Sequence, residues 1–418
     1  MLKLSSYLFL SIPILLITGP FLSDLALSLI AILFLIEVFK NKKFELFHNK
    51  FFYLFFSFYV YLILNSLLQN QNIDSLKISL SYFRFGVFSL AVVYIINNDN
   101  QILKKLYYIF LITFSVLILD GFIQFFYGKN ILGYPLSVGP RVSSLFNDEL
   151  ILGSYLSRLF PIFFALLIFL NKKINRVQYT FNYLIFIFAE VLVYLSGERV
   201  AFFYMNFAAV FTLLAVKDFK KLRIGILLSS LTLIFIISFT FPNTKQRVVN
   251  QTFDQMGLFS DKENMIFSHQ HHDLYKTAIN ITKDNLYFGV GVKNFRNKCS
   301  LDKYKISVFS CSTHPHNTYI QLLVELGLVG LIIGLTLLIF ISVYILKHFQ
   351  SLISGKYYFT DFQVCLISAI LISLWPFAPT GNVFNNWLNI VYYFPVGILL
   401  WSLEQKPKFD LKDLTKDQ

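Results

Sequence analysis

Long apolar blocks alternate with short polar stretches along most of the chain. Blocks such as "YIFLITFSVLIL" and "ILLSSLTLIFIISF" carry no charge and belong to apolar segments of roughly 17–25 residues, the length that crosses a bilayer as a helix. In lipid such segments must be helical, because the backbone amides find no other partner there. The pattern predicts an all-α, polytopic membrane protein of about twelve transmembrane helices, near 5–19, 22–39, 51–68, 78–96, 106–126, 150–170, 180–196, 199–216, 224–241, 317–346, 362–379 and 385–403.

Composition agrees with a membrane protein. Of the 418 residues 56% are hydrophobic and 14% are charged, whereas a soluble protein has about 25% charged residues. The net charge of +13 raises the question of a nucleic-acid partner. In membrane proteins, however, Lys and Arg collect on cytoplasmic loops. We therefore expect membrane lipids and no nucleic acid as partners.

The charge distribution predicts the orientation of the helices. With a cytoplasmic N-terminus, the predicted inside segments hold twenty Lys and Arg residues, and the short outside segments hold four. This asymmetry is what the positive-inside rule expects. Both termini are then predicted to be cytoplasmic.

One connection is far longer than the others. Residues 242–315 separate predicted helices 9 and 10, and the topology places them on the outer side of the membrane. The stretch "HHDLYKTAINITKDN" has helical periodicity, and "FGVGVKNF" predicts a glycine turn. The predicted organisation is therefore transmembrane helices 1–9 in 1–241, a partly helical outer loop in 242–315, helices 10–12 in 316–403 and a cytoplasmic tail in 404–418.

Two cysteines, Cys299 and Cys311, lie in this loop. On an oxidising face they are candidates for a disulfide just ahead of His314 and His316. The alternatives are free thiols, or a zinc site completed by the two histidines. The cysteine spacing is poor for zinc, and we predict no metal.

Several arginines occupy positions where a charge is costly. Arg158 lies inside a predicted span, whereas Arg141 and Arg199 lie at the outer rim of the membrane. Guanidinium groups bind phosphate through paired hydrogen bonds and stay charged, so a polyanion site is predicted. The alternative is that each arginine, Arg84 in a fourth span included, pairs with a buried carboxylate; the candidates are Asp120, Glu149, Glu190 and Glu198.

The stretch "HPHNTYIQLLVELGLVG" resembles the signature of the O-antigen ligase and polymerase superfamily. There a His followed by Asn or Ser starts a membrane helix, and a Glu-x-Gly follows about nine residues on; here these are His316, Asn317, Glu325 and Gly327. The stretches "RVSSLFNDELILGSYL", "SGERVAFF" and "ITKDNLYFGVGVKNF" also resemble family segments. The resemblance covers about 140–345.

The resemblance implies a metal- and cofactor-independent glycosyltransferase at the periplasmic face of the bacterial inner membrane. Such an enzyme moves a glycan from undecaprenyl pyrophosphate to an acceptor hydroxyl, with inversion. The acceptor is lipid A–core in a ligase, or another lipid-linked glycan in a polymerase. His316 is the expected base, although it could instead only cap its helix. Arg199, Arg141 and Arg158 are the expected pyrophosphate ligands, with Glu198 in support.

The chain also departs from the family pattern. Family members have an arginine just before the "LYKTA"-like helix, and here His271 or His272 stands in its place. Lys276, or a protonated His272, is a candidate for the missing cation. His314 is expected to be structural, and Glu325, half a turn away from His316 on an ideal helix, to contact a neighbouring helix. A twelve-span transporter or flippase is the remaining alternative, although the two halves show no similarity.

Overall fold

The computed structural model describes the chain except residues 70–72, 138, 171–174, 256–266, 356 and 406–418. Helices dominate this described part, and its only extended pairings are two isolated bridges within residues 129–141. The all-α prediction is therefore confirmed. Most of the predicted tail, 404–418, lies outside the described residues.

Eight of the described helical segments are long and apolar enough to cross a membrane, so the prediction of a multi-pass membrane protein is confirmed. Three further apolar helices are shorter, α1 with its extension (Leu2–Thr18), α9 (Arg199–Ala215) and α16 (Asp361–Ser373). A helix lies in each of the twelve predicted segments, but twelve crossings stay a prediction. The eight are α2 (Pro20–Asn41), α3 (Lys50–Gln69), α4 and α5 together (Ile73–Asn98), α6 (Ile102–Tyr127), α7 (Leu152–Phe169), α8 (Arg176–Leu195), α10 (Lys220–Thr240) and α15 (Thr318–Ile353).

Short polar residues set where several of these helices begin. Asn175 starts α8 and Thr360 starts α16, and each makes a reciprocal capping box with the glutamine three residues on. The Asn385 side chain caps α17 (Asn386–Glu404) by accepting from the Leu388 amide. Such side chains satisfy backbone amides that the first helical turn leaves free.

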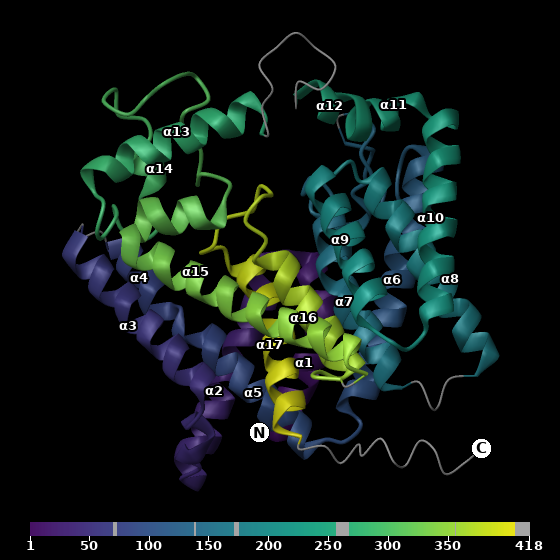
Figure 1. Cartoon of the computed structure of the whole chain (residues 1–418), viewed down its shortest axis with the longest axis horizontal. Helices are drawn as coiled ribbons and strands as arrows, with labels where there is room; N and C mark the ends of the chain where they lie inside the picture. The colour runs from purple at the N-terminus through teal and green to yellow at the C-terminus, as the bar shows by residue number, and fades with distance from the viewer. Residues whose placement is uncertain (70–72, 138, 171–174, 256–266, 356, 406–418) are drawn as a thin grey trace.

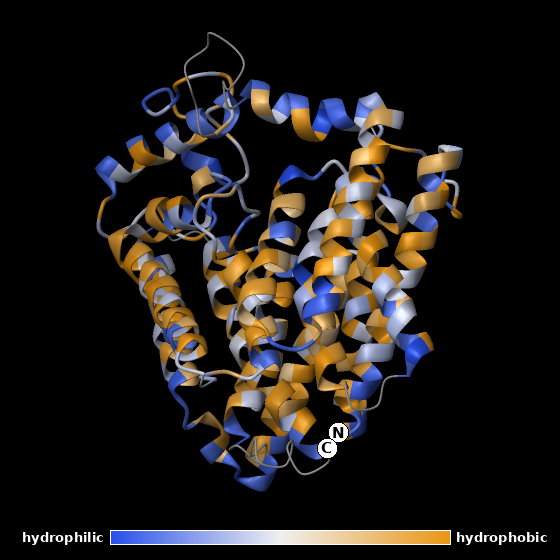
Figure 2. Cartoon of the chain, turned by 45° about the vertical axis from the view of Figure 1, so that its right-hand side comes forward, coloured by the Kyte–Doolittle hydropathy of each residue, from blue (hydrophilic) through white to orange (hydrophobic). Residues whose placement is uncertain are grey.

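The helices form a bundle whose apolar surfaces are plain in Figure 2. Helix α7 is the most enclosed span, and it packs against α16, α9, α8 and α6. Four short elements gather at one end of the bundle, which we call the site end: α11 (Pro242–Lys245), α12 (Gln251–Gln255), α13 (His269–Asp284) and α14 (Phe295–Lys298). The start of α1 and the end of α17 lie at the opposite end (Figure 1).

Helix α15 is broken at Gly327, where φ is 68° and ψ is −163°. The break is bound by the preceding glycine turn: the amides of Val290 and Gly291 donate to the carbonyls of Val324 and Glu325 at 2.9 and 2.8 Å. A Cβ on Gly327 would lie 2.2 Å from a backbone oxygen of this turn, so only glycine fits. The predicted continuous helix 317–346 is therefore wrong in this detail, and a short half-helix is set apart at the site end.

Candidate active site

His316 lies where the polar loop meets α15. Its backbone has a φ of 57°, and its carbonyl accepts a hydrogen bond from the Thr380 amide at 2.9 Å. The next residue, Asn317, caps the helix, because its side-chain oxygen accepts from the amides of Tyr319 and Ile320. The imidazole of His316 is thus not needed as the helix cap.

The imidazole of His316 is half-buried beside one hydroxyl group. Its Nε2 lies 3.2 Å from Ser312 Oγ. Burial holds the pKa of His316 below its ordinary value. A neutral imidazole can accept a proton near pH 7, so this ring is poised as a base.

A second imidazole, that of the buried His314, packs beside His316. The two ring centroids are 4.0 Å apart. His314 Nε2 lies 3.2 Å from the carbonyl oxygen of Thr380, which can only accept, so Nε2 carries the proton. Its Nδ1 then accepts from the Thr313 hydroxyl at 2.9 Å. Burial first, and then His316, lower the pKa of His314 to about 3; this ring is neutral and holds the loop in place.

The third imidazole comes from α13, the helix that the sequence periodicity predicts. His271 meets the His316 ring edge to face, with centroids 5.7 Å apart, and its Nδ1 lies 2.7 Å from Ser268 Oγ. Burial first, then His316 and Arg199, lower its pKa to about 4. His271 rather than His272 therefore contacts the candidate base, and its ring is neutral near pH 7. Lys276 is exposed on the same helix.

Three arginines gather beside these rings: Arg199 at the start of α9, Arg141 from the loop before α7, and Arg247 from the helical turn η5 (Gln246–Asn250). Arg247 interacts electrostatically with both others, and Arg199 with His271. Burial is the main reason that the pKa of Arg141 lies below its ordinary value; Glu198 opposes this and Arg247 adds to it. Like charges held together in this way form a site for an anion.

Hydrogen bonds position the three guanidinium groups. Arg199 Nη1 donates to Gln255 Oε1 at 2.7 Å, and Arg247 Nη1 donates to Gln251 Oε1 at 3.1 Å. The Nε of Arg247 is buried and has no hydrogen-bond partner among the described residues. Arg247 is not predicted from the sequence as a site residue, since no motif surrounds it and only its charge in the long loop signals it.

Arg141 is fixed by the "SGER" corner. Its Nε donates to the Ser196 carbonyl at 2.9 Å, and its side chain crosses Gly197, where a Cβ would lie 3.1 Å from Arg141 Cγ. The φ of Gly197 is 66°, which also favours glycine. The "SGER" corner therefore holds the Arg141 side chain in position.

Glu198 supports this corner from the opposite side. Its carboxylate accepts from the amides of Gly153 and Ser154 at 2.6 and 3.0 Å, and from the Ser154 hydroxyl at 2.7 Å. These groups form the first turn of α7, where a negative charge is favourable. Burial raises the pKa of Glu198, and these hydrogen bonds oppose the rise. Glu198 anchors Arg199 through the backbone rather than pairing with its side chain.

Arg158 lies deeper, in the second turn of α7, and is separate from the three arginines. Its Cζ is 4.9 Å from the ring centroid of Tyr204, and within the part of the chain that the structure describes its buried Nε and Nη1 have no hydrogen-bond partner. The same holds for the Tyr204 hydroxyl. None of the described contacts joins Arg158 to Arg199, so the structure does not bring together all the predicted pyrophosphate ligands.

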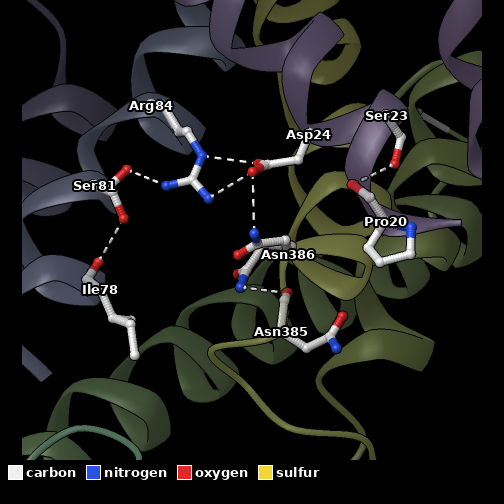
Figure 3. A network of polar contacts seen from close by, with 9 residues as sticks. Pro20, Ser23, Asp24, Ile78, Ser81, Arg84, Asn385 and Asn386 are labelled. Carbon is white, nitrogen blue, oxygen red and sulfur yellow. Dashed lines mark hydrogen bonds and ion pairs between the residues drawn. The ribbon is translucent and has the colours of Figure 1, made fainter. Parts of the chain in front are cut away.

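Arg84 pairs with a carboxylate, as the alternative to a polyanion site predicts, but the partner is Asp24 and not one of the four candidates. Arg84 binds Asp24 through Nε and Nη2 at 2.9 and 3.2 Å (Figure 3). Asp120 instead accepts from the Ser144 hydroxyl, and Glu190 from the Ser230 hydroxyl. Among the described residues, none of the four candidate carboxylates forms an ion pair with an arginine within 4 Å.

Glu325 is fully buried just before the break in α15. Its carboxylate accepts from the Gln321 side chain at 3.0 Å and from the Phe295 amide at 3.3 Å. It thus contacts its own half-helix and, as expected, a neighbouring helix, the short α14. Glu325 fixes the loop that carries the glycine turn.

Cys299 and Cys311 form a disulfide, with Cα atoms 5.0 Å apart. Both sulfurs are therefore unavailable as the thiolate ligands of the zinc alternative. Cys299 packs in a small apolar cluster with α13, while Cys311 precedes Ser312 directly. The disulfide thereby ties the segment that touches His316 to α13.

A family model described as O-antigen ligase matches residues 183–335. The matched region runs from α8 into α15 and includes Arg199, Arg247, His271 and His316. Over this region, which is less than half of the chain, the protein is similar to O-antigen ligases. No curated protein matches the chain.

Proposed function

We propose, with membership of the O-antigen ligase superfamily as the premise, that this chain is an O-antigen ligase that transfers a glycan from undecaprenyl pyrophosphate to an acceptor hydroxyl. The observation that carries the proposal is the neighbourhood of three clustered guanidinium groups, those of Arg141, Arg199 and Arg247, and the neutral imidazole of His316. His271 links the two groups, because it contacts His316 and interacts with Arg199. The site then faces the periplasm of a bacterial inner membrane.

The arginines are proposed to bind the diphosphate of the donor. As the bond between the anomeric carbon and the phosphate oxygen breaks, the electron pair leaves with the diphosphate. Fixed guanidinium groups placed where this charge develops lower the barrier. They supply the charge neutralisation that a divalent metal provides elsewhere, so the reaction is expected to proceed without one.

His316 is proposed to be the general base. Its neutral ring takes the proton of the acceptor hydroxyl as the acceptor oxygen bonds to the anomeric carbon. One displacement of this kind inverts the anomeric centre. A bound diphosphate favours protonated imidazole, so it also stabilises the product state of the proton transfer.

His271, in the first turn of α13, is proposed to replace the arginine that family members have just before the "LYKTA"-like stretch. Its pKa of about 4 argues against a permanent cation at this position. Arg247 is proposed to supply the missing positive charge, since it already interacts with Arg141 and Arg199. Lys276 and His272 are then unnecessary for pyrophosphate binding.

The test is in vitro transfer from a defined undecaprenyl-pyrophosphate glycan to lipid A–core in EDTA. We expect His316→Ala to lose roughly 10²–10⁴-fold in turnover and Arg199→Ala roughly 10²–10³-fold. Lys283→Ala on the exposed face of α13 is the matched control. Full activity of either site variant contradicts the proposal. Transfer to a second lipid-linked glycan in place of lipid A–core identifies a polymerase.

A further inference from the structure

A second basic pocket, separate from the candidate active site, opens at the site end. It has a volume of about 300 Å³ and lies between α4 (Ile73–Ser81), the first turn of α5 (Phe83–Asn98), the start of α17 and the loop before α14. Three cationic side chains line it, together with polar and apolar ones. The lining residues that matter are Lys77, Arg84, Lys293, Asn386, Phe85 and Phe384.

The floor of the pocket is a rigid, charge-balanced group (Figure 3). Arg84 binds both carboxylate oxygens of Asp24 and donates from Nη1 to the Ser81 carbonyl. The Asn386 side chain donates to the same carboxylate at 3.0 Å. Each of the three nitrogens of Arg84 thus donates a hydrogen bond within the protein, and its role is to hold α2, α5 and α17 in place.

The two lysines differ from Arg84, because neither has a buried carboxylate as an ion-pair partner among the described residues. The ammonium group of Lys293 is repelled by Arg296 and Arg84 and attracted by Glu325, without an ion pair within 4 Å in the described part of the chain. Among the described residues Lys77 pairs with Asp74, at 3.3 Å and with both side chains mostly exposed. Such a surface pair contributes little, so Lys77 can turn to a ligand.

Lys293 has an unusual backbone conformation. Its φ of 56° is unusual for a lysine, and it lies directly after the glycine turn that is bonded to the break in α15. Glu325 accepts a hydrogen bond from the Lys293 amide. The backbone of Lys293 is therefore held by the same buried carboxylate that contacts the half-helix of α15.

The pocket and the three-arginine cluster are built from different helices. In Figure 1, α4 and α14 lie to the left of the view, whereas α9 and α12 lie to the right. Arg296 connects the pocket to the histidines, because it interacts with both Lys293 and His314. A reaction between two lipid-borne substrates needs an approach from two sides, and this arrangement provides it.

We propose that this pocket binds a phosphate group of the second lipid substrate, the acceptor, through the ammonium groups of Lys77 and Lys293. The inference rests on the proposed function. Ammonium groups bind phosphate as point charges, and basic pockets between membrane helices bind lipid head groups. Phe85 and Phe384 at the wall suit the apolar part of an amphiphile, which a free phosphate lacks.

The binding test uses dihexanoyl phosphatidic acid as the probe and detergent-solubilised full-length protein, with thermal stabilisation as the readout. We expect the wild type to bind the probe more tightly than inorganic phosphate or dihexanoyl phosphatidylcholine. The double variant Lys77→Gln/Lys293→Gln should bind it at least roughly tenfold more weakly, while Lys283→Gln binds as the wild type does. Binding that is unchanged in the double variant, or equal for phosphatidylcholine, overturns the proposal. If inorganic phosphate binds as tightly as dihexanoyl phosphatidic acid, the pocket does not select a lipid.

A kinetic test separates this inference from the proposed function. With a phosphorylated lipid acceptor, Lys293→Gln should raise KM for the acceptor and leave KM for the donor unchanged, and Lys293→Arg should restore it. If the wild type transfers glycan and the acceptor KM does not change, the pocket assignment fails alone. If the wild type transfers no glycan but the probe binding depends on the lysines, the proposed function fails and the anion site stands.

Discussion

Arg84 and the three clustered arginines are held in opposite ways. Arg84 binds Asp24 with paired hydrogen bonds and is buried among α2, α5 and α17. Arg141, Arg199 and Arg247 repel one another and, within the described residues, have no carboxylate within 4 Å. Glu198 offsets part of the charge at Arg141, and the positive charge that is left favours a bound anion. The difference separates a structural guanidinium from those we propose to bind the donor.

The largest effect on stability is expected at the paired arginine. Arg84→Ala leaves Asp24 without its partner in a poorly solvated place, which costs about 3–5 kcal/mol in the free energy of unfolding. Thermal melting in detergent measures it. A variant that removes both charges, Asp24→Asn/Arg84→Gln, should recover part of the loss. A melting temperature unchanged in Arg84→Ala would contradict the structural role.

The opposite result is expected for the clustered arginines. Arg247→Ala should lower turnover roughly 10²–10³-fold, because it removes a charge from the proposed diphosphate site. Its melting temperature should stay the same or rise, since the removed charge repels Arg141 and Arg199. A loss of stability without a loss of turnover would place Arg247 with Arg84 instead.

Breaking the disulfide should lower both stability and activity, each by less than the changes above. Cys299→Ser/Cys311→Ser frees a short loop, which is expected to cost about 2–4 kcal/mol. It also loosens the segment of Ser312, so turnover should fall a few-fold. Melting temperature and transfer rate measured with and without reductant check this; a wild type indifferent to reductant would contradict it.

The pH dependence follows from the lowered imidazole pKa values. His316 must be neutral to act as a base, so kcat/KM should be level near pH 7 and fall up to tenfold per pH unit only below the ordinary histidine value of about 6.5. The folded protein binds fewer protons than the unfolded chain, because His271 and His314 titrate at about 4 and 3. Stability should therefore be fully present above about 6.5 and fall as pH drops towards these values. An acid limb well above pH 6.5 would contradict the assignment of His316.

The sequence predicts much of this picture, because the signals are local. Apolar length alone locates the helices, and periodicity locates α13. The break at Gly327 is not predicted, since its apolar neighbours suit a continuous helix and the reason for the break is a backbone contact with residues 286–291.

The parts of the site that depend on distant contacts also escape prediction. Asp24 lies 60 positions from Arg84, and neither stretch signals the other. Arg247 reaches Arg141 and Arg199 only through the fold of the long loop. The choice between His271 and His272 depends on which face α13 turns to His316, which the adjacent positions do not reveal.

The most direct test of the account is the binding of synthetic undecaprenyl diphosphate to the purified protein in EDTA, compared between the wild type and Arg199→Gln, Arg247→Gln and Lys283→Gln. The account predicts binding without a divalent metal, at least about tenfold weaker in both arginine variants and unchanged in Lys283→Gln. Binding that requires added metal, or that is the same in all four proteins, would contradict the claim that clustered guanidinium groups hold the diphosphate beside His316.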